Sequence, residues 1–89
     1  MKQNGSQVHI GHIIREQLLK DERSVSWLAR QIHCTRNHLY KVFRKASLDC
    51  ELLLRISKAM NFNFFQFYAA EIRKENEKRI GEDELRVEN

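Results

Sequence analysis

The sequence predicts an all-α fold, a compact domain of five helices. The 89 residues contain no proline and only three glycines, and no stretch alternates apolar and polar residues as a half-buried strand does. Apolar residues instead recur three and four positions apart, in segments separated by short polar breaks. A chain of this length forms one domain that buries only about 60% of its unfolded surface, so its thin core can depend on a partner.

Three segments are expected along the chain. Residues 1–8 are predicted to be a flexible leader, residues 9–70 the helical domain, and residues 71–89 a charged tail that is partly helical. In the tail, the fifth helix is expected to continue as far as Ile80, with disorder or a weak contact after Gly81.

The first two helices follow from apolar spacing and a cap. The pattern predicts a first helix over residues 9–21, because Ile10, Ile13, Ile14 and Leu18 fall on one face. Ser24 is a typical N-cap, since its hydroxyl accepts a hydrogen bond from an otherwise unpaired amide. The second helix therefore runs from there to residue 32, with an apolar stripe formed by Val25, Leu28, Ala29 and Ile32.

The third helix is predicted from Thr35, another N-cap residue, to Arg44. At about 100° per residue, Leu39, Val42 and Phe43 share one narrow arc that is expected to face the core. The remaining wide face is polar and basic, and it carries Arg36, Asn37, His38, Tyr40, Lys41, Arg44 and Lys45.

The fourth helix is predicted to begin at Ser47, with Asp49 in its first turn, where a negative charge suits the helix dipole. Its apolar positions are followed by Asn61, a residue type that tolerates the left-handed conformation after a helix. The inward-facing positions are Leu52, Leu53, Ile56, Ala59 and Met60.

The fifth helix is expected to begin at Asn63, with Phe62 and Phe67 packed together across its start. We interpret Phe62, Phe67 and Tyr68 as residues that complete the core. For Phe65 and Ile72 two interpretations stay open, a place in the core and a surface for self-association.

Positive charge is concentrated in one part of the chain. Residues 1–70 carry 11 Lys/Arg and 5 Asp/Glu, whereas residues 71–89 carry 5 and 7, which gives +6 and −2. Between Arg23 and Leu48 there are six Lys/Arg and no acid. Such a block is either a footprint for phosphate groups or a solvated face, and charge alone does not separate the two.

Two stretches carry a family resemblance. SWLARQIHCTRNHLYKVF, beginning at Ser26, and RISKAMNF, beginning at Arg55, resemble the helix-turn-helix and the fourth helix of the phage-repressor (lambda-repressor-like, XRE-like) family. The resemblance covers roughly residues 10–70. It implies that the second helix lies across the DNA backbone and that the third enters the major groove.

The resemblance also assigns contacts to particular side chains. It places Arg36, Asn37, Tyr40 and Lys41 against bases. Contacts to phosphates are expected from Arg23, Ser24, Thr35, His38, Arg44, Lys45 and Ser47. The chain departs from the family at His33, where glycine is common in the turn, and at Phe43 and Lys45, where a glutamate and a glycine are common.

These observations favour a sequence-specific double-stranded DNA-binding protein, a bacterial or phage transcriptional regulator. The family usually binds near-palindromic sites as dimers, so we expect a homodimer through Phe65, Ile72 or the tail. The alternatives are an antitoxin whose tail binds a protein partner and a protein-interaction module that works through the fourth and fifth helices.

Other classes of function fit poorly. No nucleophile, base and orienting group form a set, and no glycine-rich phosphate loop is present, so no enzyme and no cofactor are expected. His33, Cys34 and His38 lie close together, but a structural zinc site normally needs four ligands at paired spacings, so no metal is expected. The absence of a long apolar run argues against a membrane span, and two cysteines without a disulfide framework suit the cytoplasm.

Overall fold

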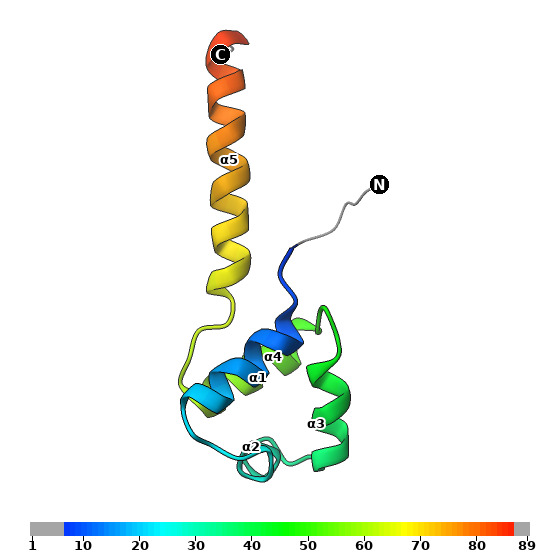
Figure 1. The fold of residues 1–89 in the computed structure, drawn as a ribbon. Coiled ribbons are helices and arrows are strands. Elements are labelled where there is room, and N and C mark those ends of the chain that lie inside the picture. Colours follow the sequence, from blue (N-terminus) through cyan, green and yellow to red (C-terminus); the bar gives the residue numbers. More distant parts are fainter. Residues whose placement is uncertain (1–6, 87–89) are drawn as a thin grey trace.

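The computed structural model describes residues 7–86, and the side chains of residues 7–77. The described chain is all-helical, with no strand, as the sequence predicts. The five helices are α1 (Ile10–Lys20), α2 (Val25–Gln31), α3 (Arg36–Phe43), α4 (Cys50–Met60) and α5 (Gln66–Arg86) (Figure 1).

The first four helices form a compact bundle around one core. Helix α3 packs against α1 and α2, and α2 also packs against α4. Helix α5 leaves this bundle and extends away from it (Figure 1). The buried apolar side chains are Ile10, Ile14, Leu18, Leu28, Ala29, Ile32, Leu39, Val42, Phe43, Leu53, Ile56, Met60 and Phe64.

Side-chain caps fix several helix ends where the sequence predicts them. The hydroxyl of Ser24 accepts a hydrogen bond from the Trp27 amide at 2.9 Å, and that of Thr35 accepts one from the His38 amide at 3.0 Å. Asn61 ends α4 with a φ of 52°, in the left-handed region. These local predictions are confirmed.

The predicted starts of α4 and α5 are wrong. Helix α4 is capped by Asp49 rather than Ser47, and the Asp49 carboxylate accepts a hydrogen bond from the Leu52 amide at 2.8 Å. A carboxylate at this end also interacts favourably with the helix dipole. Helix α5 begins at Gln66, because the Asn63 side chain accepts a hydrogen bond from the Phe65 amide at 3.0 Å and holds a turn before the helix.

The aromatic residues around the start of α5 differ in burial. Phe64 is fully buried, while Phe62, Phe67 and Tyr68 are partly buried and pack against the core, which confirms their predicted place. The rings of Phe62 and Phe67 lie 6.2 Å apart, as the predicted contact requires. Phe65 is also partly buried, whereas 61% of Ile72 is exposed, so Ile72 is not a core residue.

The segment before α1 contacts the first part of α5. The Gln7 amide donates a hydrogen bond to the Glu71 carboxylate at 2.8 Å, and Val8 packs against the core. Helix α5 continues through Gly81 to Arg86, beyond the predicted end near Ile80. The rest of the predicted leader, residues 1–6, and the tail residues 87–89 lie outside the described residues. Within the described part, no helix is both long and apolar enough to cross a membrane.

The N-terminus of α1 is docked on the C-terminal end of α3. The amides of Ile10 and Gly11 donate hydrogen bonds to the carbonyls of Ala46 and Lys45, both at 3.0 Å. Unpaired amides at the start of one helix are thereby satisfied by carbonyls that follow another. A Cβ atom on Gly11 would lie 2.5 Å from the carbonyl oxygens of Val42 and Phe43, so only glycine permits this approach.

Gly11→Ala is therefore expected to lower the free energy of unfolding by about 1–3 kcal/mol, the usual cost of overpacking a close contact. Thermal and urea unfolding followed by circular dichroism measure the change. The direction of the change in stability is informative, because alanine is a better helix former than glycine by about 1 kcal/mol and would stabilise α1 if the space were open. A more stable Gly11→Ala protein would contradict the close approach, and Glu16→Ala on the exposed face of α1 is the near-neutral control.

Candidate nucleic-acid interface

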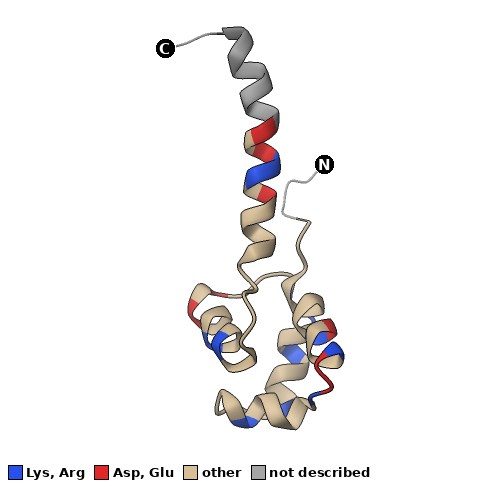
Figure 2. Ribbon diagram, turned by 90° about the vertical axis from the view of Figure 1, so that its left-hand side faces the viewer, with Lys and Arg blue, Asp and Glu red and all other residues tan. Residues whose placement is uncertain are grey.

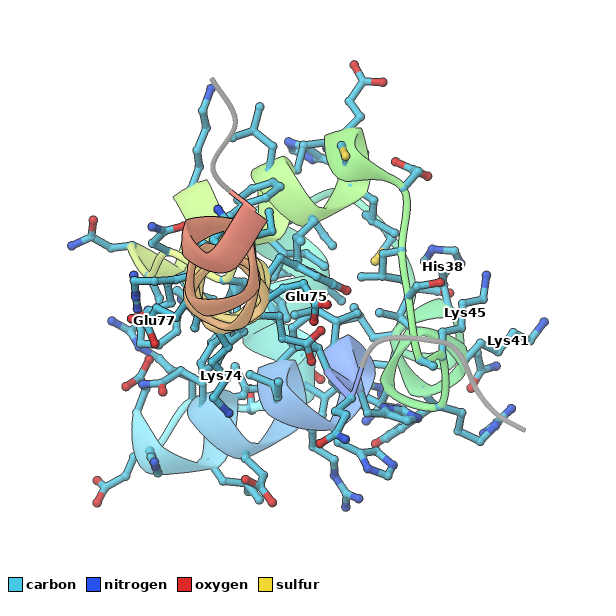
Figure 3. The ribbon with its side chains drawn as sticks, turned by 90° about the horizontal axis from the view of Figure 1, so that it is seen from above. His38, Lys41, Lys45, Lys74, Glu75 and Glu77 are labelled. Atoms are coloured by element: carbon cyan, nitrogen blue, oxygen red, sulfur yellow. The ribbon has the colours of Figure 1, made fainter. Side chains whose placement is uncertain are left out.

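Helix α3 divides into a buried side and an exposed side, as the sequence predicts. Leu39, Val42 and Phe43 are at most 4% exposed. The side chains assigned to base contacts all lie on the exposed side: Arg36, Asn37, Tyr40 and Lys41. His38, Lys41 and Lys45 point outward from α3, away from α5 (Figure 3).

The turn between α2 and α3 sets where this exposed face begins. His33 adopts a positive φ of 59°, and the Cys34 amide donates a hydrogen bond to the Ala29 carbonyl at 2.9 Å. From α4, the Arg55 guanidinium donates to the Ile32 carbonyl at the end of α2. The turn is thus held both by its own backbone and by a side chain from another helix.

Replacing His33 tests the cost of this turn. A non-glycine residue in the left-handed conformation lowers the free energy of unfolding by about 1–2 kcal/mol, a cost that glycine avoids. Glycine also gives the unfolded chain more conformational freedom, which cancels part of this gain. His33→Gly is expected to raise the free energy of unfolding by up to about 1 kcal/mol, and His33→Val to lower it, in urea titrations. Asn61→Gly is the matched control and should change less, because asparagine tolerates this conformation. A destabilised His33→Gly protein would contradict the interpretation.

The residues predicted to contact phosphates occupy three places. Arg23 and Ser24 precede α2, Thr35 and His38 lie at the start of α3, and the third group follows α3. All of them are exposed, and the third group consists of Arg44, Lys45 and Ser47.

Several of these side chains are already oriented. The Arg23 guanidinium lies 4.2 Å from the centre of the Trp27 ring, which holds it beside the start of α2. The hydroxyls of Ser24 and Thr35 accept capping hydrogen bonds, so each keeps its own proton for donation to an acceptor outside the protein. This arrangement suits an anionic ligand that spans α2 and α3.

A groove between α1 and α3 was not predicted from the sequence. It has a volume of about 300 Å³ and contains side chains from both helices. The sequence signal was Gly11, which marks a close helix contact and so brings the residue one turn later, Arg15, near α3. The lining residues are His12, Arg15, Tyr40, Phe43 and Arg44.

The described residues contain no group of three or more His, Cys, Asp or Glu side chains placed to hold a metal ion. Cys34 is half-buried in the α2–α3 turn, while Cys50 is exposed at the start of α4. Burial raises the pKa of the Cys34 thiol above its usual value, and the charge of Arg55 offsets part of this increase.

A raised pKa lowers the thiolate fraction of Cys34 near neutral pH, and the thiolate is the reactive form. We expect iodoacetamide to alkylate Cys34 more slowly in the folded protein than in the same chain unfolded in urea, with the difference shrinking as the pH rises. Mass spectrometry of the Cys50→Ser protein measures the rate at Cys34 alone. Equal rates in the folded and unfolded chains would show that the turn does not shield this thiol.

Comparisons with protein-family models, with curated proteins and with solved structures found no match to this chain. The assignment of a function consequently depends on the geometry and chemistry of the chain itself.

Proposed function

We propose that this protein binds double-stranded DNA sequence-specifically as a transcriptional regulator, with α2 and α3 as a helix-turn-helix. One observation carries the proposal: the exposed face of α3 gathers Arg36, Asn37, Tyr40 and Lys41, with no acid between Arg23 and Leu48. A helix with this face fits the major groove in width and in charge.

The proposed base contacts follow from side-chain chemistry. Arg36 and Lys41 can donate to O6 and N7 of guanine, and Asn37 can form paired hydrogen bonds with N6 and N7 of adenine. Tyr40, which is 45% exposed, offers an apolar ring edge for a thymine methyl group and a hydroxyl for a phosphate. Each well-placed bidentate pair discriminates against a wrong base by about 1–3 kcal/mol.

The phosphate contacts supply affinity rather than specificity. Phosphate contacts from Arg44 and Lys45, at the end of α3, would hold this helix in register on the DNA. Arg23 and the hydroxyls of Ser24 and Thr35 would add phosphate contacts at the other positions. Each phosphate neutralised by a cation releases counterions, so binding should weaken steeply as salt rises.

The proposal includes a homodimer, because two copies related by a two-fold axis read an inverted repeat. Two parts of the surface favour self-association: Ile72 on α5, which is 61% exposed, and a groove of about 440 Å³ beside α4. Phe65 lines that groove together with Leu54, which is 44% exposed.

The same surface supports the alternative, an antitoxin or another module that binds a protein partner through α5. Acidic and basic residues are mixed along the described part of α5 (Figure 2), as on a helix that is solvated or pairs with a charged partner. A plain protein-interaction module differs from the proposal in one respect, since it does not require Arg36 or Asn37, whereas an antitoxin would be supported by a neighbouring toxin gene.

Selection of bound duplexes from a random pool tests the proposal. The wild-type protein should enrich an inverted repeat, and Arg36→Ala combined with Asn37→Ala should relax or abolish it, because the base contacts are removed while the fold remains. Lys20→Ala removes a cation from an exposed position on α1, outside the proposed base contacts and the candidate dimer surface, and should leave the motif unchanged.

Enrichment of no sequence, or binding whose affinity does not change between low and moderate salt, would contradict DNA recognition by α3. If the variant that lacks Arg36 and Asn37 still selected the motif, residues other than these two would have to contact the bases.

A further inference from the structure

We propose that the groove between α1 and α3 seats a DNA backbone phosphate, held by Arg15 of α1 together with Arg44 of α3. The inference rests on the proposed DNA binding and extends it to α1, a helix to which neither the sequence pattern nor the family resemblance assigns a contact.

The groove is lined by aromatic and cationic side chains. Phe43, one of the lining residues, is 4% exposed, and the Tyr40 ring meets Phe43 edge-on, with ring centres 6.2 Å apart. Arg15 and Arg44 line it from the two helices, and His12 lines it from α1. The groove therefore combines a buried apolar ring with two guanidinium groups, both on exposed residues.

Within the described part of the chain, no acidic side chain neutralises the charges in this groove. Among the described residues, neither Arg15 nor Arg44 forms an ion pair, and Glu16, which follows Arg15 in the chain, does not line the groove. A guanidinium presents a planar set of donors that matches the oxygens of a phosphate. Two of them on one groove favour an anionic ligand over a neutral one, and the proposed DNA partner supplies phosphates.

The spacing of the two arginines is set by the helix contact at Gly11. Arg15 lies one turn after Gly11, and Arg44 immediately follows α3, whose terminal carbonyls surround Gly11. Two backbone hydrogen bonds hold this close approach of α1 to the end of α3 without any ligand. The seat is therefore preformed rather than assembled by the ligand.

The groove lies toward the C-terminal end of α3. The proposed base contacts at Arg36 and Asn37 lie at the N-terminal end of α3, whereas the groove lies beside Tyr40, Phe43 and Arg44. A recognition helix that meets bases at its first turn approaches the sugar-phosphate wall toward its other end. A contact from α1 there would fix the tilt of α3 in the major groove from the side opposite α2.

Arg15→Ala tests the proposal, with Lys20→Ala as the matched control, since Lys20 is an exposed cation on α1 that does not line the groove. Affinity for the selected duplex is measured across a range of salt concentrations. Arg15→Ala should weaken binding roughly tenfold at moderate salt and lower the slope of log affinity against log salt by about 0.9. Arg15→Lys should keep the slope and recover part of the affinity, and Lys20→Ala should match the wild type.

Ethylation interference locates the phosphate. Ethylation of one phosphate outside the bases read by α3 should weaken the wild-type protein clearly more than Arg15→Ala, which has already lost one of the two contacts to that phosphate. Circular dichroism and thermal unfolding check that the exposed Arg15 is not needed for folding.

The two proposals fail differently. A wild-type protein that binds no duplex removes both. A wild-type protein that selects an inverted repeat, with Arg15→Ala equal to wild type or Lys20→Ala equally impaired, overturns the phosphate seat and leaves the proposed function standing. A response of His12 and Arg15 resonances to inorganic phosphate, without any change in duplex binding by Arg15→Ala, would mark a free-anion site instead and also overturn it.

Discussion

The contact between the start of α1 and the end of α3 is the constraint on which the rest of this structure depends. Two amides of α1 are paired with the carbonyls of Lys45 and Ala46, and Gly11 lies against the carbonyls of Val42 and Phe43. Helix α3 has only eight residues, so it owes its place to the packing of Leu39, Val42 and Phe43 and to this contact rather than to its own stability. The contacts at the two ends of α3 therefore determine the direction in which its exposed face points.

The opposite end of α3 is fixed by different means. The Thr35 hydroxyl caps the first turn, the α2–α3 turn passes through His33 at positive φ, and Arg55 reaches from α4 to the last carbonyl of α2. A strained backbone is tolerated here because the surrounding contacts determine it. The direction of the Arg36 and Asn37 side chains is consequently a property of the whole bundle, not of α3 alone.

Much of this arrangement can be predicted from the sequence, because it depends on near neighbours. Ser24 and Thr35 cap helices through amides three residues away, Asn61 turns the chain locally, and the buried side of α3 follows from helical spacing. The start of α4 could not be placed in this way, since Ser47 and Asp49 are both acceptable caps. The structure uses the later residue, whose carboxylate accepts the Leu52 amide and whose negative charge suits the helix dipole.

The parts of the site that sequence reasoning missed are those made by tertiary contacts. Gly11, one turn before Arg15, marks a close helix contact but does not say which residues lie across it, so the groove that Arg15 shares with Tyr40 and Arg44 becomes visible only in the folded chain. Likewise, Phe65 and Ile72 are both large apolar residues, yet Phe65 is half-buried and Ile72 is exposed. They differ because Phe65 packs against the bundle, whereas Ile72 lies further along α5, beyond the end of the bundle. The extent of α5 beyond Gly81 was also underestimated, because a single glycine lowers helix stability without ending a helix.

The central claim is that the exposed face of α3 is the surface that meets DNA. A heteronuclear NMR titration of the wild-type protein with its selected duplex tests this most directly, because each backbone amide reports separately. The account predicts that the largest shifts occur at Arg36, Asn37, Tyr40 and Lys41, with smaller shifts at Ser24, while the amides of α5 from Gln66 to Glu77 change little. Shifts confined to α5, or no saturable shifts on α3, would contradict the claim.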